Sequence, residues 1–239
     1  MQMTLSAESL AEFYHDDFAQ EQVDDLGALA GRSMLDATIV DLGGGVGHFS
    51  ELLRTQHRAD ASVLDMDGES VRRCLLRGVP ALIGDAITTR AADGNDFAAF
   101  NMILHHLVAP GFRATEELQT AALANLAIRG GPKRVFVSEF VYEGYVLNWP
   151  AALIFAVTSS KALSTAASSV ARFIPSLRAN TFGVGVRFRA APDWARMFAR
   201  SGWRVSAHRT HPSGPIGVAK LVALGLRSWR RDSFLLERQ

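Results

Sequence analysis

The sequence is short of cysteine and of net charge. Cys74 is the only cysteine among 239 residues, which excludes an intramolecular disulfide and any metal site that needs several cysteines. We expect no metal. Lysine is scarce too, and the formal net charge is +1. A nearly neutral chain lacks the broad positive field that attracts nucleic acid or an acidic membrane surface, so we expect neither as a partner.

Long apolar stretches are also lacking. The longest such run, residues 149–158, is too short to span a bilayer. Residues 1–4 show neither the basic nor the apolar region of a signal peptide. We therefore expect a cytoplasmic protein. With 48% hydrophobic and 21% charged residues, the composition is typical of a globular domain that can bury a substantial core.

What the sequence does contain is a regular alternation of strand-like and helix-like segments. Short apolar runs typical of buried strands are separated by segments with helical periodicity. This alternation predicts an α/β fold with a Rossmann-like, doubly wound, mostly parallel sheet. The polar end of the last expected strand favours a position at the sheet edge. Strands are expected at 34–42, 61–64, 79–83, 97–102, 134–140, 203–208 and 233–237, and helices at 6–30, 48–57, 69–77, 115–129 and 191–201.

The whole chain, 1–239, is expected to form a single domain. Residues 1–36 form an N-terminal helical cap, 37–141 the ligand-binding core, and 191–239 a closing helix and strands. Residues 142–190 interrupt the alternation with alanine, serine and aromatic residues and two expected helices. Such a stretch is too long for a simple crossover, so we expect a helical lid insertion over the carboxyl edge of the sheet.

A glycine-rich turn follows the first expected strand. Residues 41–47 read Asp-Leu-Gly-Gly-Gly-Val-Gly. Glycine suits positions where the backbone takes a positive φ or lies against a ligand, and a following helix offers unpaired N–H groups to an anionic ligand group. The spacing departs from the G-x-G-x-x-G of dinucleotide sites. Asp41 would repel a pyrophosphate but can accept the ammonium of an amino-acid ligand.

Two further carboxylates follow the next two strands. Asp65, beside Met66, can accept both hydroxyls of a ribose, and Asp85, beside Ala86, can accept an adenine amino group. Met66 offers an apolar face to the ring. Each residue also has a purely structural alternative: Asp65 as a helix N-cap, Asp85 as a turn cap, and Gly44 as relief of packing between turn and helix.

In order and spacing, these motifs resemble the class I S-adenosylmethionine-dependent methyltransferases over residues 37–141. The resemblance implies a seven-stranded sheet with an antiparallel last strand and S-adenosylmethionine (SAM) as cofactor. It also implies a set of cofactor-binding residues at the carboxyl edge. These are Tyr14, Asp41, Gly43, Gly44, Gly45, Gly47, Asp65, Met66, Asp85, Ala86 and Asn101.

A pair of histidines follows the fourth expected strand. The stretch resembles the small-molecule O-methyltransferases of plant and polyketide type, whose His-Asp-Trp sequence supplies a base. Here His105 takes the place of that histidine, while His106 and Leu107 replace the Asp-Trp. A histidine can take a hydroxyl proton near neutral pH, and Glu139 in the fifth strand is expected to orient this base or touch the acceptor. The alternative is that both histidines are only packed or hydrogen-bonded.

The methyl acceptor is expected to be a small molecule. Aromatic residues in and near the insertion favour an apolar or aromatic pocket, with core packing as the alternative, and Arg187 and Arg189 could bind an acidic group. The motifs of nucleic-acid methyltransferases are missing. We expect O-methylation in specialised metabolism, with N- or C-methylation, other chemistry such as cyclisation, or SAM binding without catalysis as alternatives. A homodimer is an assembly to test. The aromatic residues are Phe140, Tyr142, Tyr145, Trp149, Phe155, Phe173 and Phe182.

Overall fold

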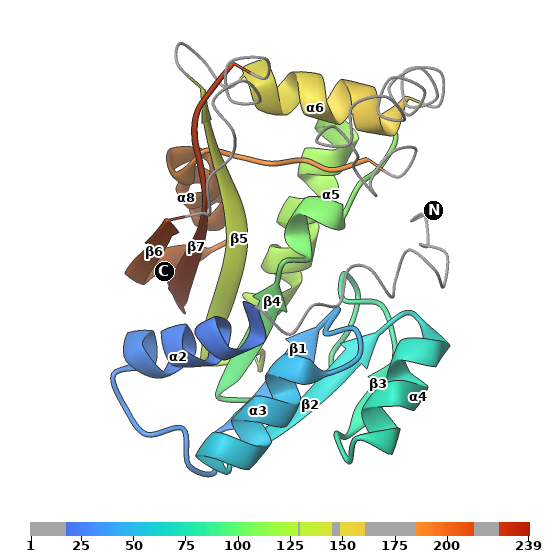
Figure 1. The fold of residues 1–239 in the computed structure, drawn as a ribbon, viewed down its shortest axis with the longest axis vertical. Coiled ribbons are helices and arrows are strands. Elements are labelled where there is room, and N and C mark those ends of the chain that lie inside the picture. The colour runs from blue at the N-terminus through green and yellow to red at the C-terminus, as the bar shows by residue number, and fades with distance from the viewer. Residues whose placement is uncertain (1–17, 129, 145–148, 161–184, 213–224) are drawn as a thin grey trace.

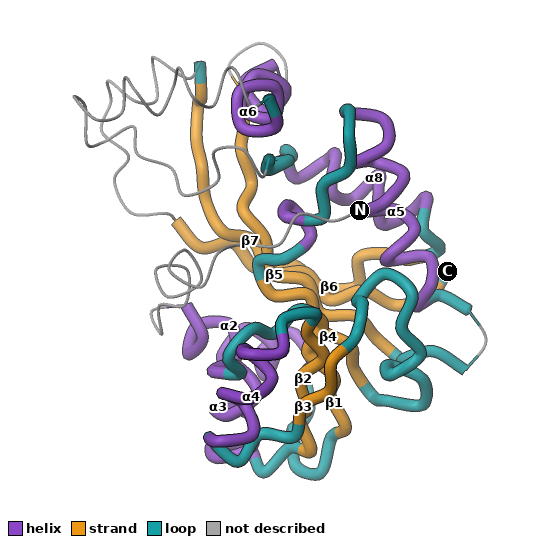
Figure 2. Tube along the Cα trace, turned by 90° about the vertical axis from the view of Figure 1, so that its right-hand side faces the viewer, coloured by secondary structure: helices purple, strands orange, loops and turns teal. Residues whose placement is uncertain are grey.

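The structure, a computed structural model, describes residues 18–128, 130–144, 149–160, 185–212 and 225–239. Within these ranges, one seven-stranded sheet has the order β3-β2-β1-β4-β5-β7-β6. Helices cover both faces: α2, α3 and α4 lie on one side, and α5 and α8 on the other (Figures 1 and 2). The strands are β1 (Thr38–Leu42), β2 (Asp60–Asp65), β3 (Ala81–Ile83), β4 (Phe97–Asn101), β5 (Arg134–Gly144), β6 (Trp203–Pro212) and β7 (Leu226–Arg238).

The strand directions confirm the predicted mixed sheet. All pairs among β1 to β5 are parallel, and β7 is antiparallel to both β5 and β6. The expected edge position of residues 233–237 is wrong, because Phe234 pairs with Val137 of β5 and with His208 of β6. Phe234, Leu235 and Leu236 are all buried. This continuous apolar run suits a strand covered on both faces, which outweighs the polar residues at its end.

The helices follow the expected periodicity closely. In the second crossover, Asp67 caps α4, since its carboxylate accepts the backbone N–H of Ser70 at 2.8 Å. The N-cap is therefore Asp67 and not Asp65, which frees Asp65 for another task. None of the helices in the described ranges is long and apolar enough to cross a membrane. The helices are α2 (Ala19–Ala30), α3 (His48–His57), α4 (Gly68–Leu76), α5 (Phe112–Leu126), α6 (Trp149–Ser159) and α8 (Ala191–Arg200).

The core has a layer on each face of the sheet. Along β5, Val135 and Val137 pack into the layer beneath α5 and α8, whereas Phe136 packs into the opposite layer with α2 and α3. On that second face, the rings of Phe136 and Phe49 are stacked with centroids 6.0 Å apart. Side chains that alternate across a strand bury apolar area against helices on both faces.

The sheet is extended where the acceptor would be expected. β5 and β7 continue beyond the end of β4 toward α6 (Figure 1). There, Arg189 lies beside β5 through an isolated parallel bridge to Val141, and its carbonyl accepts the backbone N–H of Tyr142. Of the expected insertion, 142–190, the parts at 145–148 and 161–184 lie outside the described residues, as do residues 1–17 of the expected cap, 1–36.

Candidate active site

The glycine turn brings the backbone close to its neighbours. Gly43, Gly45 and Gly47 have φ values of +72°, +55° and +84°, which favour glycine. A Cβ atom on Gly43 would lie 2.7 Å from Cγ1 of Ile103, and one on Gly44 would collide with the carboxylate of Asp41. Glycine is therefore needed in this turn for two reasons: the positive φ values, and the close approach of Ile103 and Asp41 to the backbone.

Asp65 holds this turn from the end of β2. Its Oδ2 accepts the backbone N–H of Gly45 at 2.9 Å, and its Oδ1 accepts that of Asp67 at 2.8 Å. Burial raises the pKa of Asp65, while the two backbone hydrogen bonds act in the opposite direction. Because each carboxylate oxygen can accept more than one hydrogen bond, Asp65 retains capacity for a ligand hydroxyl.

Asp41 lies at the end of β1 and is almost completely buried, at 1% exposure. Nδ2 of Asn101 donates to its Oδ1 at 3.0 Å. Burial raises the pKa of Asp41 to about 7; the hydrogen bond from Asn101 opposes this shift and the charge of Asp65 adds to it. In the described part of the chain, the buried Oδ1 of Asn101 has no hydrogen-bond partner. A buried acceptor oxygen of this kind is normally satisfied by a hydrogen-bond donor.

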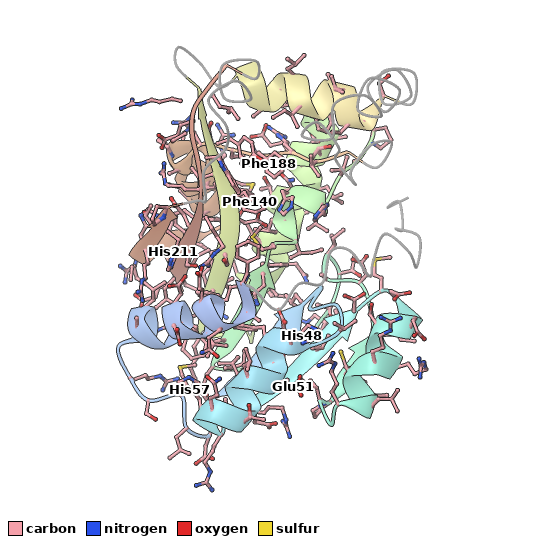
Figure 3. All side chains as sticks on the ribbon, viewed as in Figure 1. His48, Glu51, His57, Phe140, Phe188 and His211 are labelled. Atoms are coloured by element: carbon pink, nitrogen blue, oxygen red, sulfur yellow. The ribbon has the colours of Figure 1, made fainter. Side chains whose placement is uncertain are left out.

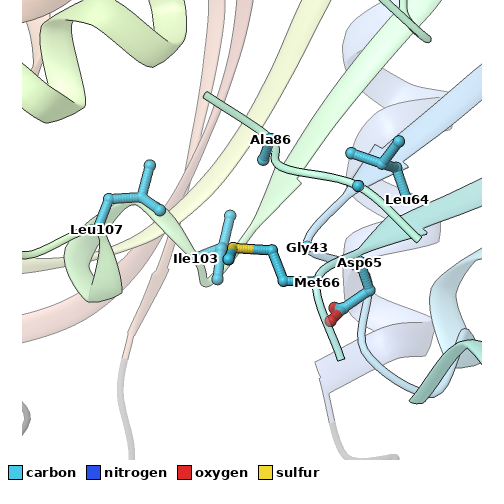
Figure 4. A pocket seen from close by; sticks show the side chains of 8 residues that line it. Gly43, Leu64, Asp65, Met66, Ala86, Ile103 and Leu107 are labelled. Atoms are coloured by element: carbon cyan, nitrogen blue, oxygen red, sulfur yellow. The ribbon is translucent and has the colours of Figure 1, made fainter. Parts of the chain in front are cut away.

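A pocket opens at the carboxyl edge beside these residues (Figure 4). It encloses about 330 Å³, including its open mouth. Four of the expected cofactor residues line it: Gly43, Asp65, Met66 and Ala86. Apolar residues after β4, Ile103 and Leu107, line it as well; they were not predicted, although their position at the carboxyl end of a strand is a usable signal. The full lining is Gly43, Leu64, Asp65, Met66, Gly84, Ala86, Ile103 and Leu107.

Asp85 is not among the residues that line this pocket, unlike Asp65. One of its carboxylate oxygens accepts the backbone N–H of Ile87 at 2.8 Å, so the side chain caps its own turn. Its neighbours Gly84 and Ala86 line the pocket. Tyr14, the remaining expected contact from the N-terminal segment, lies outside the described residues.

His105 and Glu139 are in direct contact. Nδ1 of His105 lies 2.6 Å from Oε2 of Glu139, with side-chain exposures of 5% and 0%. His105 belongs to a 3₁₀ turn, η2 (Leu104–His106), which begins just after Met102, a residue with φ of +56°. Oε1 of Glu139 accepts the backbone N–H of Leu104 at 2.7 Å. Glu139 therefore holds both the ring of His105 and the turn that carries it.

Aromatic rings surround the His105 imidazole. Phe188 is stacked on it with centroids 5.1 Å apart, and Phe140 lies at 6.0 Å (Figure 3). Phe188 is also stacked on Tyr142 at 4.2 Å. Burial lowers the pKa of the adjacent His106 well below its ordinary value, and the charge of His105 adds to this. His106 is thus expected to be neutral near pH 7.

The two expected acceptor arginines point inward. Both Arg187 and Arg189 are buried. Arg187 donates to the backbone carbonyl of Phe112 at 2.8 Å and to Glu116 at 3.1 Å, so its charge is paired within the protein. Of the expected aromatic pocket, Tyr145, Phe173, Phe182 and the side chain of Trp149 are not among the described groups. No group of three or more His, Cys, Asp or Glu side chains that could hold a metal ion occurs in the described ranges.

Comparisons with known proteins identify the fold. No protein-family model matches the sequence, and no curated protein does. Mitomycin 7-O-methyltransferase MmcR is 18% identical with a TM-score of 0.59, over 92% of this chain and 54% of that one. Magnesium protoporphyrin IX methyltransferase ChlM from Synechocystis PCC 6803, solved with bound SAM, is 12% identical with a TM-score of 0.56, over 94% and 80%.

Geranyl diphosphate C-methyltransferase from Streptomyces coelicolor A3(2) is 11% identical with a TM-score of 0.57, over 92% of this chain and 77% of that one. The present chain spans about half the length of MmcR. Together with the strand order, these likenesses show that the chain has the fold of the class I SAM-dependent methyltransferases. At such identities the likeness defines the fold alone.

Proposed function

We propose that this chain is a SAM-dependent methyltransferase that acts on a small molecule, with O-methylation as the reaction. The observation that carries the proposal is the buried contact between His105 and Glu139, 2.6 Å long. The turn that bears His105 lies between Ile103 and Leu107, which both line the pocket. A hydrogen-bonded histidine and carboxylate next to a ligand pocket is a recognised arrangement for a general base.

The residues at the carboxyl edge fit SAM. The Oδ1 of Asn101, which has no hydrogen-bond partner in the described ranges, and the buried carboxylate of Asp41 would receive the ammonium of its amino-acid part. Asp65 would accept the ribose hydroxyls, and Met66 and Ala86 line the pocket that the adenine would share. When bound, SAM supplies an electrophilic methyl group on a sulfonium sulfur. That ChlM was solved with this cofactor on the same fold supports the assignment.

The protein's own contribution to transfer is positioning and proton removal. Because Glu139 accepts a hydrogen bond from Nδ1 of His105, it favours the tautomer whose Nε2 is free of a proton. Nε2 then takes the proton of an acceptor hydroxyl, and the carboxylate of Glu139 stabilises the imidazolium that results. A positioned base of this kind contributes roughly 10²–10⁴-fold. Alignment of the acceptor supplies a further share of the rate.

Other reactions are possible on this fold, and two solved structures illustrate the range. MmcR is named as an O-methyltransferase and the Streptomyces coelicolor enzyme as a C-methyltransferase. N- or C-methylation, or SAM binding without transfer, are therefore the alternatives. The rings of Phe140 and Phe188 beside His105, with Tyr142 stacked on Phe188, support an aromatic acceptor.

The test combines binding and turnover. Calorimetric titration should show that the wild type binds SAM and that Asp65→Ala loses at least tenfold in affinity. A panel of hydroxylated aromatic compounds, assayed by release of S-adenosylhomocysteine, should yield a substrate. With it, His105→Gln should lose 10²-fold or more in kcat at unchanged SAM affinity. Full turnover by that variant would refute the base, and SAM binding without transfer to any acceptor would favour a binding protein.

A further inference from the structure

We propose that Gln119 and Arg189 are positioning residues that fix His105 in its working orientation. This inference rests on the proposed function, because it concerns the same base. Gln119 comes from α5, and Arg189 from the segment beside the extended part of β5. Both side chains are buried, at 0% and 6% exposure.

The turn that carries His105 is held from two sides. Glu139 accepts the backbone N–H of Leu104, and Nε2 of Gln119 donates to the backbone carbonyl of the same residue at 2.7 Å. The carbonyl of His105 itself accepts the backbone N–H of Arg187 at 2.9 Å. A single 3₁₀ turn has weak internal hydrogen bonding, so these external bonds determine where the imidazole lies.

Arg189 determines which way the amide of Gln119 faces. A guanidinium group of Arg189 donates to Oε1 of Gln119. Since arginine can only donate, the amide oxygen must face Arg189 and the amide NH₂ must face Leu104. The chain of contacts thus runs from Arg189 through Gln119 and Leu104 to Glu139 and His105. Loss of the arginine would allow the amide to turn over and release the carbonyl of Leu104.

The charge of Arg189 acts in the same direction. Burial lowers its pKa to about 10, with a further contribution from the charge of Arg187, whereas Glu116, Asp193 and Glu139 oppose the shift. Arg189 therefore remains cationic at neutral pH. The charges of Arg189 and Glu139 attract each other, and a carboxylate at Glu139 is the group that accepts the hydrogen bond from Nδ1 of His105.

Stability alone gives a poor account of Arg189. Its Nε is buried and, within the ranges that the structure describes, has no hydrogen-bond partner. A buried donor left unsatisfied is costly, and replacing buried ionic groups by apolar side chains of similar volume is often neutral or stabilising. The positively charged side chain is explained instead by its attraction to Glu139 and by its contact with Gln119, which holds the turn at Leu104.

The first test reads the His105 ring without an acceptor. Long-range ¹H–¹⁵N NMR spectra of the full chain with ¹⁵N-labelled histidine report the tautomer of each ring, and loss of one signal set in His105→Gln assigns His105. The wild type should show the tautomer protonated at Nδ1. Gln119→Leu and Arg189→Met should change the tautomer ratio by at least threefold. Arg231→Met is the matched control, because it removes a buried arginine whose side chain donates to Asp25 and Glu21 instead.

The second test measures turnover on the hydroxylated acceptor found with the wild type. Gln119→Leu and Arg189→Met should lower kcat by tenfold or more, keep the KM for SAM within twofold, and shift the acidic limb of the kcat profile with pH. Arg189→Lys, which keeps the charge, should restore part of the loss. If a variant fails to fold, Gln119→Asn, which keeps the amide but shortens its reach, replaces it.

An unchanged tautomer ratio and unchanged kcat in folded Gln119→Leu and Arg189→Met would overturn the positioning role. Equal losses in Arg231→Met would overturn it as well, because they would show a general effect of removing a buried charge. Failure of the proposed function looks different: the tautomer would respond to Gln119 and Arg189, but His105→Gln would keep full turnover.

Discussion

The amide of Asn101 donates to Oδ1 of Asp41 at 3.0 Å, while its own oxygen is buried without a partner among the described residues. The pair therefore presents an acceptor oxygen and a buried carboxylate at neighbouring strand ends. Both groups would be satisfied by one cationic donor. This relationship supports the proposal that the amino-acid part of SAM is held here, and it makes the site sensitive to pH.

Cofactor affinity should fall as the pH falls through about 7. Burial raises the pKa of Asp41 to about 7, and only the ionised carboxylate attracts an ammonium group. Between pH 7.5 and pH 6, the dissociation constant for SAM should rise roughly tenfold, as expected when the competent state becomes a minor one. Calorimetric titration across this range measures it. Asp41→Asn should bind SAM weakly at every pH with a flat profile; a flat profile in the wild type would contradict the assignment.

The contribution of Asp41 to the stability of the ligand-free protein should increase as the pH falls, whereas the affinity for SAM should decrease. A carboxyl group whose folded pKa is raised contributes stability that is fully present below its unfolded value, near 3.8, and is lost as the pH rises through about 7. Asp41→Asn should therefore be more stable than the wild type at pH 8, by about 2–4 kcal/mol, in urea unfolding without ligand. Equal stability of the two proteins at pH 8 would mean that Asp41 ionises freely.

Asp96 is a control for Asp41, because its pKa is shifted in the opposite direction. Its hydrogen bond with Lys133, assisted by one from the backbone of Thr38, lowers the pKa of Asp96 to about 2 against the effect of burial. The stability from this group is present above the unfolded pKa of 3.8 and is lost as the pH falls through about 2. Asp96→Asn should thus destabilise the protein at pH 8. Stabilisation by both substitutions would indicate a general effect of removing negative charge.

The Cys74 thiol should be unreactive in the folded protein. It is fully buried, and its Sγ donates to the backbone carbonyl of Gly45 at 3.1 Å. Burial raises its pKa to about 11, and the charges of Asp41 and Asp65 add to the shift. Since the thiolate is the reactive form, labelling by a disulfide reagent at pH 8 should be at least a hundredfold slower than in urea. Rapid labelling of the folded protein would show that the glycine turn opens readily.

Local sequence pattern predicted most of the fold. The helix at 48–57 and the succession of strands along the chain follow from periodicity and from glycine and proline positions, which act over a few residues. The place of β7 did not follow, because the partner of a strand is chosen over long separations. Phe234 meets Val137 only in the folded sheet. A polar strand end is a weaker signal than burial on both faces.

The site was predictable in its strand-end residues and not in what supports them. Asp41 and Asp65 stand at the ends of their strands, where ligands of such sheets bind, and Glu139 follows the last residue of β5 that pairs with β4. Gln119 and Arg189 are 70 residues apart and meet only after folding, where Gln119 also reaches the carbonyl of Leu104. A glutamine in a helix and an arginine in an irregular segment carry no sequence signal for such a contact.

The close approach of Gly43 and Ile103 gives a test of the turn itself. Gly43→Ala and Gly78→Ala each place a Cβ at a positive φ, +72° and +75°, so both should lose about 1 kcal/mol to backbone strain. Only the Cβ on Gly43 meets a neighbour, Cγ1 of Ile103 at 2.7 Å, whereas nothing lies within 4 Å of one on Gly78. Because Gly43 and Ile103 both line the pocket, Gly43→Ala should bind SAM at least tenfold more weakly and Gly78→Ala normally.

The double variant Gly43→Ala, Ile103→Ala should be more stable than Gly43→Ala alone, since the second substitution removes the clash. If the two single variants Gly43→Ala and Gly78→Ala bind SAM equally well, the turn does not border the cofactor.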